Sequence, residues 1–208
     1  MISLFYWLRY KLFARHKYGH GIHSPFLYKF IRDVLLPEKY AEIFKANEEI
    51  FWKVNQNSLS IEELEIGTFG MYVKEIYSLQ MKYRRLLSNL AAYQLLYFSR
   101  KGENYAIFRS ADEFFKKDIN EQFVTAIWFI RNISDITAEE KNKIFELINK
   151  SEEKAVIVAG GIYKTREASN FWKELKALEK VTLTVDLYEY GLLFFRKELR
   201  KENYVIKY

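Results

Sequence analysis

The clearest hydrophobic pattern lies in the last third of the chain, residues 154–208. A short unbroken apolar run, Ala155–Gly160, is mostly β-branched and ends in two glycines. Such a run is typical of a strand buried on both faces. The sequence then predicts a helix capped by Thr165. The apolar residues at helical spacing on its predicted inner face are Ala168, Phe171, Trp172, Leu175 and Leu178.

Two more strands are predicted after this helix. Residues Val181–Tyr188 have the character of a strand, Glu189–Gly191 read as a tight turn, and Leu192–Arg196 return beside the first strand. A strand, a helix, a strand and a hairpin strand together indicate the closing edge of an open α/β sheet.

The preceding part of the chain continues the mixture of helices and strands. Strands are predicted at residues 61–66, 104–108 and 123–130, and helices at 2–15, 26–36, 38–55, 71–98 and 137–150. Ser24 and Pro25 form an N-cap with proline at the first helical position, and Thr137 with Glu140 forms a capping box. We therefore expect an N-terminal helical segment, residues 1–60, followed by an α/β domain, residues 61–208.

The first helix is apolar around most of its circumference. Leu4, Phe5, Leu8 and Leu12 share one face at helical spacing. The aromatic residues that cover much of the remainder are Tyr6, Trp7, Tyr10 and Phe13. Such a helix needs cover on more than one side, so it either packs on the domain, or docks on a partner chain or in a membrane interface.

The composition limits the kinds of chemical site that the chain can contain. The chain of 208 residues is 50% hydrophobic and contains no cysteine. Disulfides, zinc–thiolate sites, iron–sulfur clusters and a thiol nucleophile are thereby excluded, and a cytoplasmic location fits. No segment reaches the roughly 18 apolar residues that a membrane-spanning helix needs.

Positive charge gathers at the N-terminal end. Residues 1–36 hold six Lys or Arg residues against one acid, Asp33, which is +5 of the total +6. A basic end suits an anionic partner, either nucleic acid or a membrane surface, and it also suits a solvated rim. Membrane association therefore stays open beside the cytoplasmic expectation.

The segment Tyr18–Phe26 contains two histidines, two glycines and a Ser-Pro pair. His20, His23 and Ser24 are its candidate binding residues. Two histidines without a third ligand make a weak metal site, so no metal is expected. Hydrogen bonding within the loop and binding of an anionic group are the remaining interpretations.

Two stretches together resemble a known family. Gly19–Tyr28 (GHGIHSPFLY) is similar to the N-terminal signature of a bacterial group of class I S-adenosylmethionine-dependent methyltransferases, and Val181–Leu199 with Tyr204–Tyr208 is similar to the ending of that group. Tyr83–Phe98 also resembles the helix before the first sheet strand of the group. The resemblance implies a reduced Rossmann-like, mostly parallel sheet with helices on both faces and an antiparallel C-terminal strand.

The chain departs from this family where the cofactor would bind. The strand Tyr105–Phe108 runs into Arg109–Glu113 without a glycine, and two later strands of the family are missing. The next two strand ends, Phe129–Ser134 and Ala159–Ile162, lack the acids and the histidine of the family. Since open α/β sheets bind ligands at these ends, we expect no catalytic residues and no bound cofactor.

One stretch favours the opposite conclusion. Glu63–Gly70 imitates a glycine motif on a strand-to-helix turn. The residues that would line an S-adenosylmethionine site there are Glu65, Gly67, Thr68 and Gly70, with Asp112 near the ribose. The alternative interpretation is a turn at the start of a helix, where glycine is needed only for its backbone angles.

Three functional hypotheses follow. The first is a degenerate, non-catalytic methyltransferase-like protein (a pseudoenzyme) that binds a protein partner or another copy of itself through its N-terminal helices. The second is an active methyltransferase with S-adenosylmethionine at Gly67–Gly70. The third is binding of nucleic acid or of an anionic membrane surface through the basic, aromatic N-terminus.

Overall fold

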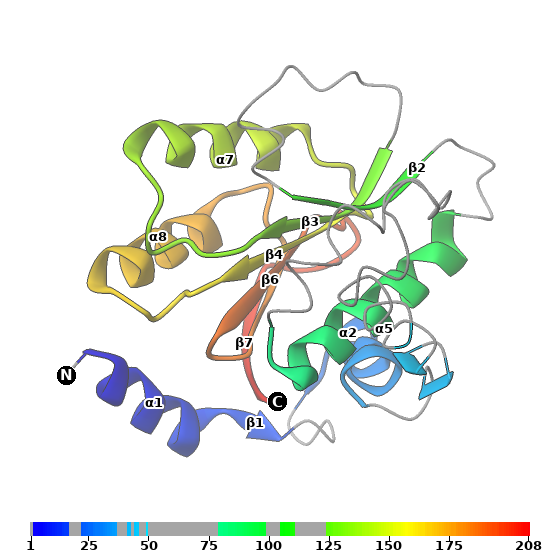
Figure 1. Cartoon of the computed structure of the whole chain (residues 1–208), viewed down its shortest axis with the longest axis horizontal. Coiled ribbons are helices and arrows are strands. Elements are labelled where there is room, and N and C mark those ends of the chain that lie inside the picture. Colours follow the sequence, from blue (N-terminus) through cyan, green and yellow to red (C-terminus); the bar gives the residue numbers. More distant parts are fainter. Residues whose placement is uncertain are drawn as a thin grey trace.

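The structure, a computed structural model, describes residues 2–16, 22–36, 79–98, 105–110 and 124–208, with a few residues between 41 and 49. Figure 1 shows the arrangement of its elements. The helices are α1 (Ile2–Phe13), α2 (Pro25–Phe30), the π-helix η1 (Ile31–Leu35), α5 (Met81–Phe98), α7 (Ala138–Lys150) and α8 (Arg166–Ala177). The strands are β1 (Arg15–His16), β2 (Tyr105–Ser110), β3 (Val124–Ile130), β4 (Val156–Gly160), β5 (Leu183–Asp186), β6 (Tyr190–Phe194) and β7 (Glu202–Lys207).

These strands form one mixed, seven-stranded sheet in the order β1-β7-β5-β6-β4-β3-β2. Strands β2, β3 and β4 pair in parallel, and β6 pairs antiparallel with both β4 and β5. Strand β7 is parallel to β5, and β1 is parallel to β7. Six strands therefore run in one direction, and β6 alone runs against them.

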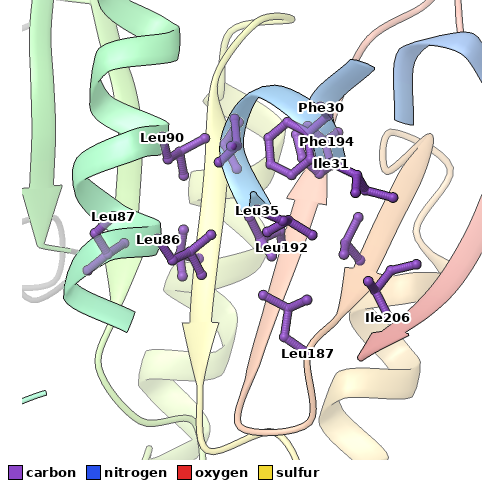
Figure 2. Close-up of a cluster of buried hydrophobic side chains, with 14 of the residues drawn as sticks. Phe30, Ile31, Leu35, Leu86, Leu87, Leu90, Leu187, Leu192, Phe194 and Ile206 are labelled. Carbon is purple, nitrogen blue, oxygen red and sulfur yellow. The ribbon is translucent and has the colours of Figure 1, made fainter. Parts of the chain in front are cut away.

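Helices cover both faces of the sheet. On one face, α2, η1 and α5 pack over the apolar side chains of β3 to β7. Figure 2 shows Phe30 of α2 beside Phe194 of β6, and Leu86 and Leu90 of α5 in the same cluster of buried side chains. On the other face, α7 and α8 pack over β3, β4 and β6. The chain is thus an α/β protein with a mixed sheet between two helical layers and an additional N-terminal helix.

The helix starts follow the predicted capping chemistry. Ser24 Oγ accepts a hydrogen bond from the Leu27 amide at 3.3 Å, and Pro25 is the first helical residue. Thr137 and Glu140 form the complete capping box of α7. Thr165 caps α8, whose predicted inner face is buried at Ala168, Phe171, Trp172 and Leu175. The side chains of Ser24, Thr137 and Thr165 thus accept hydrogen bonds from backbone amides that the first turn of a helix leaves unpaired.

The hairpin was predicted correctly, but its turn was misplaced. The reversal between β5 and β6 falls at Leu187–Glu189, where Leu187 N donates to Tyr190 O, and Gly191 belongs to β6. A Cβ on Gly191 would lie 2.4 Å from Trp172 Cη2. The glycine therefore makes room for a buried indole of α8 and has no part in the turn.

The predicted sheet also needs a correction at its C-terminal edge. The antiparallel strand is β6, inserted between β4 and β5, while the last strand, β7, runs parallel to β5. Strands β7 and β1 were not predicted from the sequence. The strand predicted at 61–66 and most of the helix at 38–55 lie outside the described residues. Within the described part of the chain, no helix is long and apolar enough to cross a membrane.

Candidate functional site

The carboxyl ends of the parallel strands meet at one edge of the sheet, where open α/β sheets bind their ligands. The segments that follow β4 and β5 bring Tyr163 and Tyr188 to this edge. Helix α1 lies there too, beside β7 and the C-terminus (Figure 1). A cluster of tyrosines from α1 and from these segments joins the helix to the sheet.

Tyr6 makes the first contact between α1 and the sheet edge. Its ring stacks on that of Tyr163, with centroids 4.4 Å apart and planes inclined by 13°. Its hydroxyl accepts a hydrogen bond of 2.6 Å from Ser169 Oγ, at the start of α8. One side chain of α1 therefore holds both the segment after β4 and the buried face of α8.

Tyr10, one helical turn later, makes the second contact. Its hydroxyl donates to the Ile206 carbonyl at 2.8 Å and accepts from the Tyr208 amide at 2.8 Å. Its ring centroid lies 5.3 Å from that of Tyr188. Burial raises the pKa of Tyr10 to about 12, so this hydroxyl keeps its proton at neutral pH. Strand β1 then pairs with β7, which fixes the end of α1.

A buried carboxyl group lies beneath the tyrosines. Asp186, at the end of β5, is 2% exposed and accepts hydrogen bonds from the Tyr163 hydroxyl and from the Tyr188 amide. Burial raises the pKa of Asp186, and these hydrogen bonds oppose the shift. Tyr188 has a φ of 75°, in the left-handed region that costs a bulky residue energy. The Asp186 carboxyl group is thus hydrogen-bonded within the hairpin and to Tyr163.

A small pocket of about 250 Å³ opens beside this cluster. Its lining residues are Gly161, Tyr163, Lys164, Tyr188, Glu189 and Tyr190. The two charged members already have partners, because Lys164 Nζ lies 3.8 Å from Asp135 Oδ2 and Glu189 Oε1 lies 3.9 Å from Lys82 Nζ. The pocket therefore offers aromatic surface with few uncommitted polar groups.

The loops after β3 and β4 close on each other. Ile133 N donates to the Gly160 carbonyl at 2.9 Å, and Asn132 Oδ1 accepts from Ser134 at 2.8 Å. A Cβ on Gly161 would meet Asn132 Oδ1 at 2.0 Å, and Gly161 has a φ of 72°. The Ile133–Gly160 hydrogen bond and the close approach of Asn132 to Gly161 thus join the two loops, while the Asn132–Ser134 bond lies within the loop after β3.

The opposite face of α1 projects away from the domain. Leu4, Phe5, Leu8 and Leu12 are 59%, 65%, 46% and 74% exposed. The sequence predicted these four residues on one face. At 100° per residue, Tyr6 lies about 200° from Leu4 around the helix, and Tyr10 lies about 200° from Leu8. The tyrosine face of α1 thus packs on the domain, as one interpretation expected, and its leucine face is exposed in the part of the chain that the structure describes.

The predicted site residues are only partly placed. Ser24 is buried and caps α2, and His23 beside it is exposed. His20, Glu65, Gly67, Thr68, Gly70 and Asp112 lie outside the described residues. Among the residues that are described, no group of three or more His, Asp or Glu side chains could hold a metal ion.

Comparisons with protein-family models, with curated proteins and with solved structures each found no match. The resemblance to methyltransferases therefore rests on the sequence motifs alone.

The tyrosine cluster was not predicted from the sequence. The spacing of Tyr6 and Tyr10 was visible, since residues four apart share a helix face. Nothing in the pattern showed that tyrosines would pack inward while leucines faced out. Which face of α1 packs inward depends on Tyr163, Ser169 and the end of β7, which lie more than 150 residues away in the sequence.

Proposed function

We propose that the chain is a non-catalytic, methyltransferase-like binding protein that docks through the outer face of α1. The observation that carries the proposal is the orientation of this helix. Tyr6 and Tyr10 fix it on the sheet edge, and Leu4, Leu8 and Leu12 point away from the domain. Contiguous exposed apolar surface of this kind marks interaction sites.

The strand ends support the non-catalytic part of the proposal. Asp186 is buried and bonded to Tyr163 and Tyr188, and the Asn132 side chain fills the space over Gly161. A cofactor held at these ends would need polar groups that are exposed and uncommitted. At the ends of β4 and β5, the described part of this edge carries tyrosine rings and the N-terminal helix.

A thermal-shift titration with S-adenosylmethionine and S-adenosylhomocysteine tests this part. A ligand at 100 times its Kd stabilises the folded state by about 2.7 kcal/mol, which a melting curve resolves. We expect no shift up to millimolar ligand. A clear shift that disappears in Gly67→Arg would overturn the proposal and favour an active methyltransferase with its cofactor at Gly67–Gly70.

A further inference from the structure

We propose that the outer face of α1 is an anchor for the surface of a membrane that contains anionic lipids. This inference rests on the docking role proposed above for α1 and names its partner. Three features of the helix carry it: an aliphatic ridge, basic flanks with an aromatic boundary, and a rigid attachment to the domain.

The aliphatic ridge runs along the length of the helix. Leu4, Leu8 and Leu12 recur at intervals of four residues, and Phe5 lies beside them. The helix spans about 18 Å at 1.5 Å per residue. A helix that lies in the plane of a bilayer interface buries such a ridge about 5–10 Å into the boundary between headgroups and acyl chains.

Basic residues lie on both sides of the ridge. About Leu8, Lys11 is rotated by roughly 60° in one direction and Arg9 by roughly 100° in the other. Both are exposed, and residues 2–16 contain no acid. Cations in these positions can extend to headgroup phosphates while the leucines lie deeper.

The positive charge on the Arg9 side continues onto α8. Desolvation lowers the pKa of Lys176, and the nearby charges of Arg9 and Lys173 lower it further, although Asp186 opposes them. The hydrogen bond between Tyr6 of α1 and Ser169 of α8 brings the two helices together beside these cations. Arg9 and Lys11, both exposed on a helix without acidic residues, supply the charge complementarity to an anionic surface.

On the Lys11 side the helix carries an interfacial aromatic residue. Trp7 is 42% exposed, and Lys11 Nζ lies 5.6 Å from its ring centroid. Tryptophan prefers the boundary between headgroups and acyl chains, where its ring is partly desolvated and its N–H stays wet. Trp7 therefore lies where a boundary residue of an interfacial helix belongs.

The attachment of α1 makes the anchor rigid. Tyr6 is held by Tyr163 and Ser169, Tyr10 is held by β7, and β1 joins the sheet directly after the helix. A helix that is folded and oriented before it meets its partner loses little conformational entropy on binding. Leu4, Leu8 and Leu12 have no π-face on which a base could stack, so these three residues suit lipid better than nucleic acid.

The test is flotation of the full-length protein with two kinds of vesicle. One kind is pure phosphatidylcholine, and the other is an equal mixture of phosphatidylcholine and phosphatidylglycerol. We expect binding to the mixed vesicles that weakens as salt is raised, because screening shortens the reach of the charges. The Trp7 fluorescence should shift to the blue with mixed vesicles, and Trp7→Phe should remove that shift.

Variants separate the contributions of charge and ridge. The pair Arg9→Gln and Lys11→Gln should lower the apparent affinity about thirtyfold, at roughly fivefold per cation. Leu8→Gln should lower it by roughly tenfold or more, since a leucine is no longer buried in lipid.

Two matched controls should bind as the native chain does. Lys197→Gln removes an exposed cation at the opposite end of the sheet strands, and Tyr28→Ser changes an exposed residue of α2. All the altered residues are exposed, so unchanged melting curves would verify the fold.

Equal binding to both vesicle types, with no effect of Arg9→Gln and Lys11→Gln, would overturn the anionic preference. Absence of vesicle binding would overturn the inference as a whole. If the unbound protein instead self-associates in sedimentation, and Leu8→Gln abolishes that association, the docking role of α1 survives and its partner is a second copy. Salt-sensitive binding of single-stranded DNA without vesicle binding would likewise assign α1 to another partner. Cofactor binding in the thermal-shift titration is a separate readout, so the two failures are distinguishable.

Discussion

The rings of Tyr6 and Tyr163 stack at 4.4 Å across the junction between the N-terminal helix and the carboxyl edge of the sheet. Tyr163 also donates to the buried carboxyl of Asp186, so the pair links α1 to β4 and β5 together. The position of α1, and hence the orientation of its exposed face, depends on this contact and on the hydrogen bonds of Tyr10.

Tyr6→Ala should loosen α1 from the domain. The change removes the stacked ring and the partner of Ser169, and we expect the free energy of unfolding to fall by roughly 1–3 kcal/mol. Tyr6→Phe keeps the ring and should cost about 1 kcal/mol. Urea denaturation measures both, and hydrogen exchange should locate the loss of protection in α1. Leu12→Ala, at a residue 74% exposed, is the control and should stay within about 0.5 kcal/mol of the native chain.

Tyr10→Phe isolates one hydroxyl group. Without it, the Ile206 carbonyl and the Tyr208 amide lose their partner, which should cost roughly 1–3 kcal/mol if water does not replace it. Hydrogen exchange should show faster exchange at the Tyr208 amide, with β4 unchanged. The matched control is Tyr28→Phe on α2, where the exposed hydroxyl should contribute nothing measurable. Equal protection of Tyr208 in the native chain and in Tyr10→Phe would show that this bond does not hold the end of β7.

Asp186 makes stability depend on pH in the direction opposite to that of most carboxylates. Burial raises its pKa in the folded protein above the unfolded value, so the folded state binds the proton more strongly. This contribution to stability is complete below the unfolded pKa, near 4, and is lost as the pH rises through the folded value. The free energy of unfolding of the native chain relative to Asp186→Asn should therefore decrease as the pH is raised from about 4.

Asp135→Asn serves as the control for that measurement. A hydrogen bond from Ser134 lowers the pKa of the exposed Asp135 carboxyl, so its contribution should be lost on acidification and should have the opposite slope. Urea denaturation from below pH 4 to neutral pH gives both comparisons, since the Asp135 contribution changes below about pH 4 and that of Asp186 changes above it. Parallel pH curves for the native chain and Asp186→Asn would refute the assignment of a raised pKa, whatever the absolute stability of the variant.

Much of the fold was predictable because its signals are local. The buried strands β3 and β4, the caps at Ser24, Thr137 and Thr165, and the hairpin all follow from patterns within about ten residues. Strand β7 was missed because a single strand with half-exposed residues at its ends has a weak period-two signal. Its pairing with β5 and β1 is a long-range property that the pattern does not contain.

The candidate site was less predictable than the fold. The leucine face of α1 was recognised, but a helix that is apolar nearly all round does not reveal which side packs. Tyr6 packs inward because Tyr163 and Ser169 lie opposite it, and only the assembled sheet brings these residues together. The buried role of Asp186 was equally hidden, since an acid at a strand end more often faces a ligand or solvent.

Gly191 was predicted in the turn, but it lies in β6 against Trp172 of α8. Its Cα faces the indole of Trp172, which is fully buried, and a Cβ would lie 2.4 Å from Trp172 Cη2. Gly191→Ala should therefore lower the free energy of unfolding by roughly 1–3 kcal/mol through overpacking.

The cause of that loss can be tested with a double-mutant cycle. In a Trp172→Leu background the indole is gone, so Gly191→Ala should cost much less than in the native chain. A glycine required only for its backbone angles would give the same cost in both backgrounds. Additive free energies in urea denaturation would therefore contradict the packing explanation. A coupling of about 1 kcal/mol or more would establish that glycine is required at this position because Trp172 packs against it and holds α8 on the sheet.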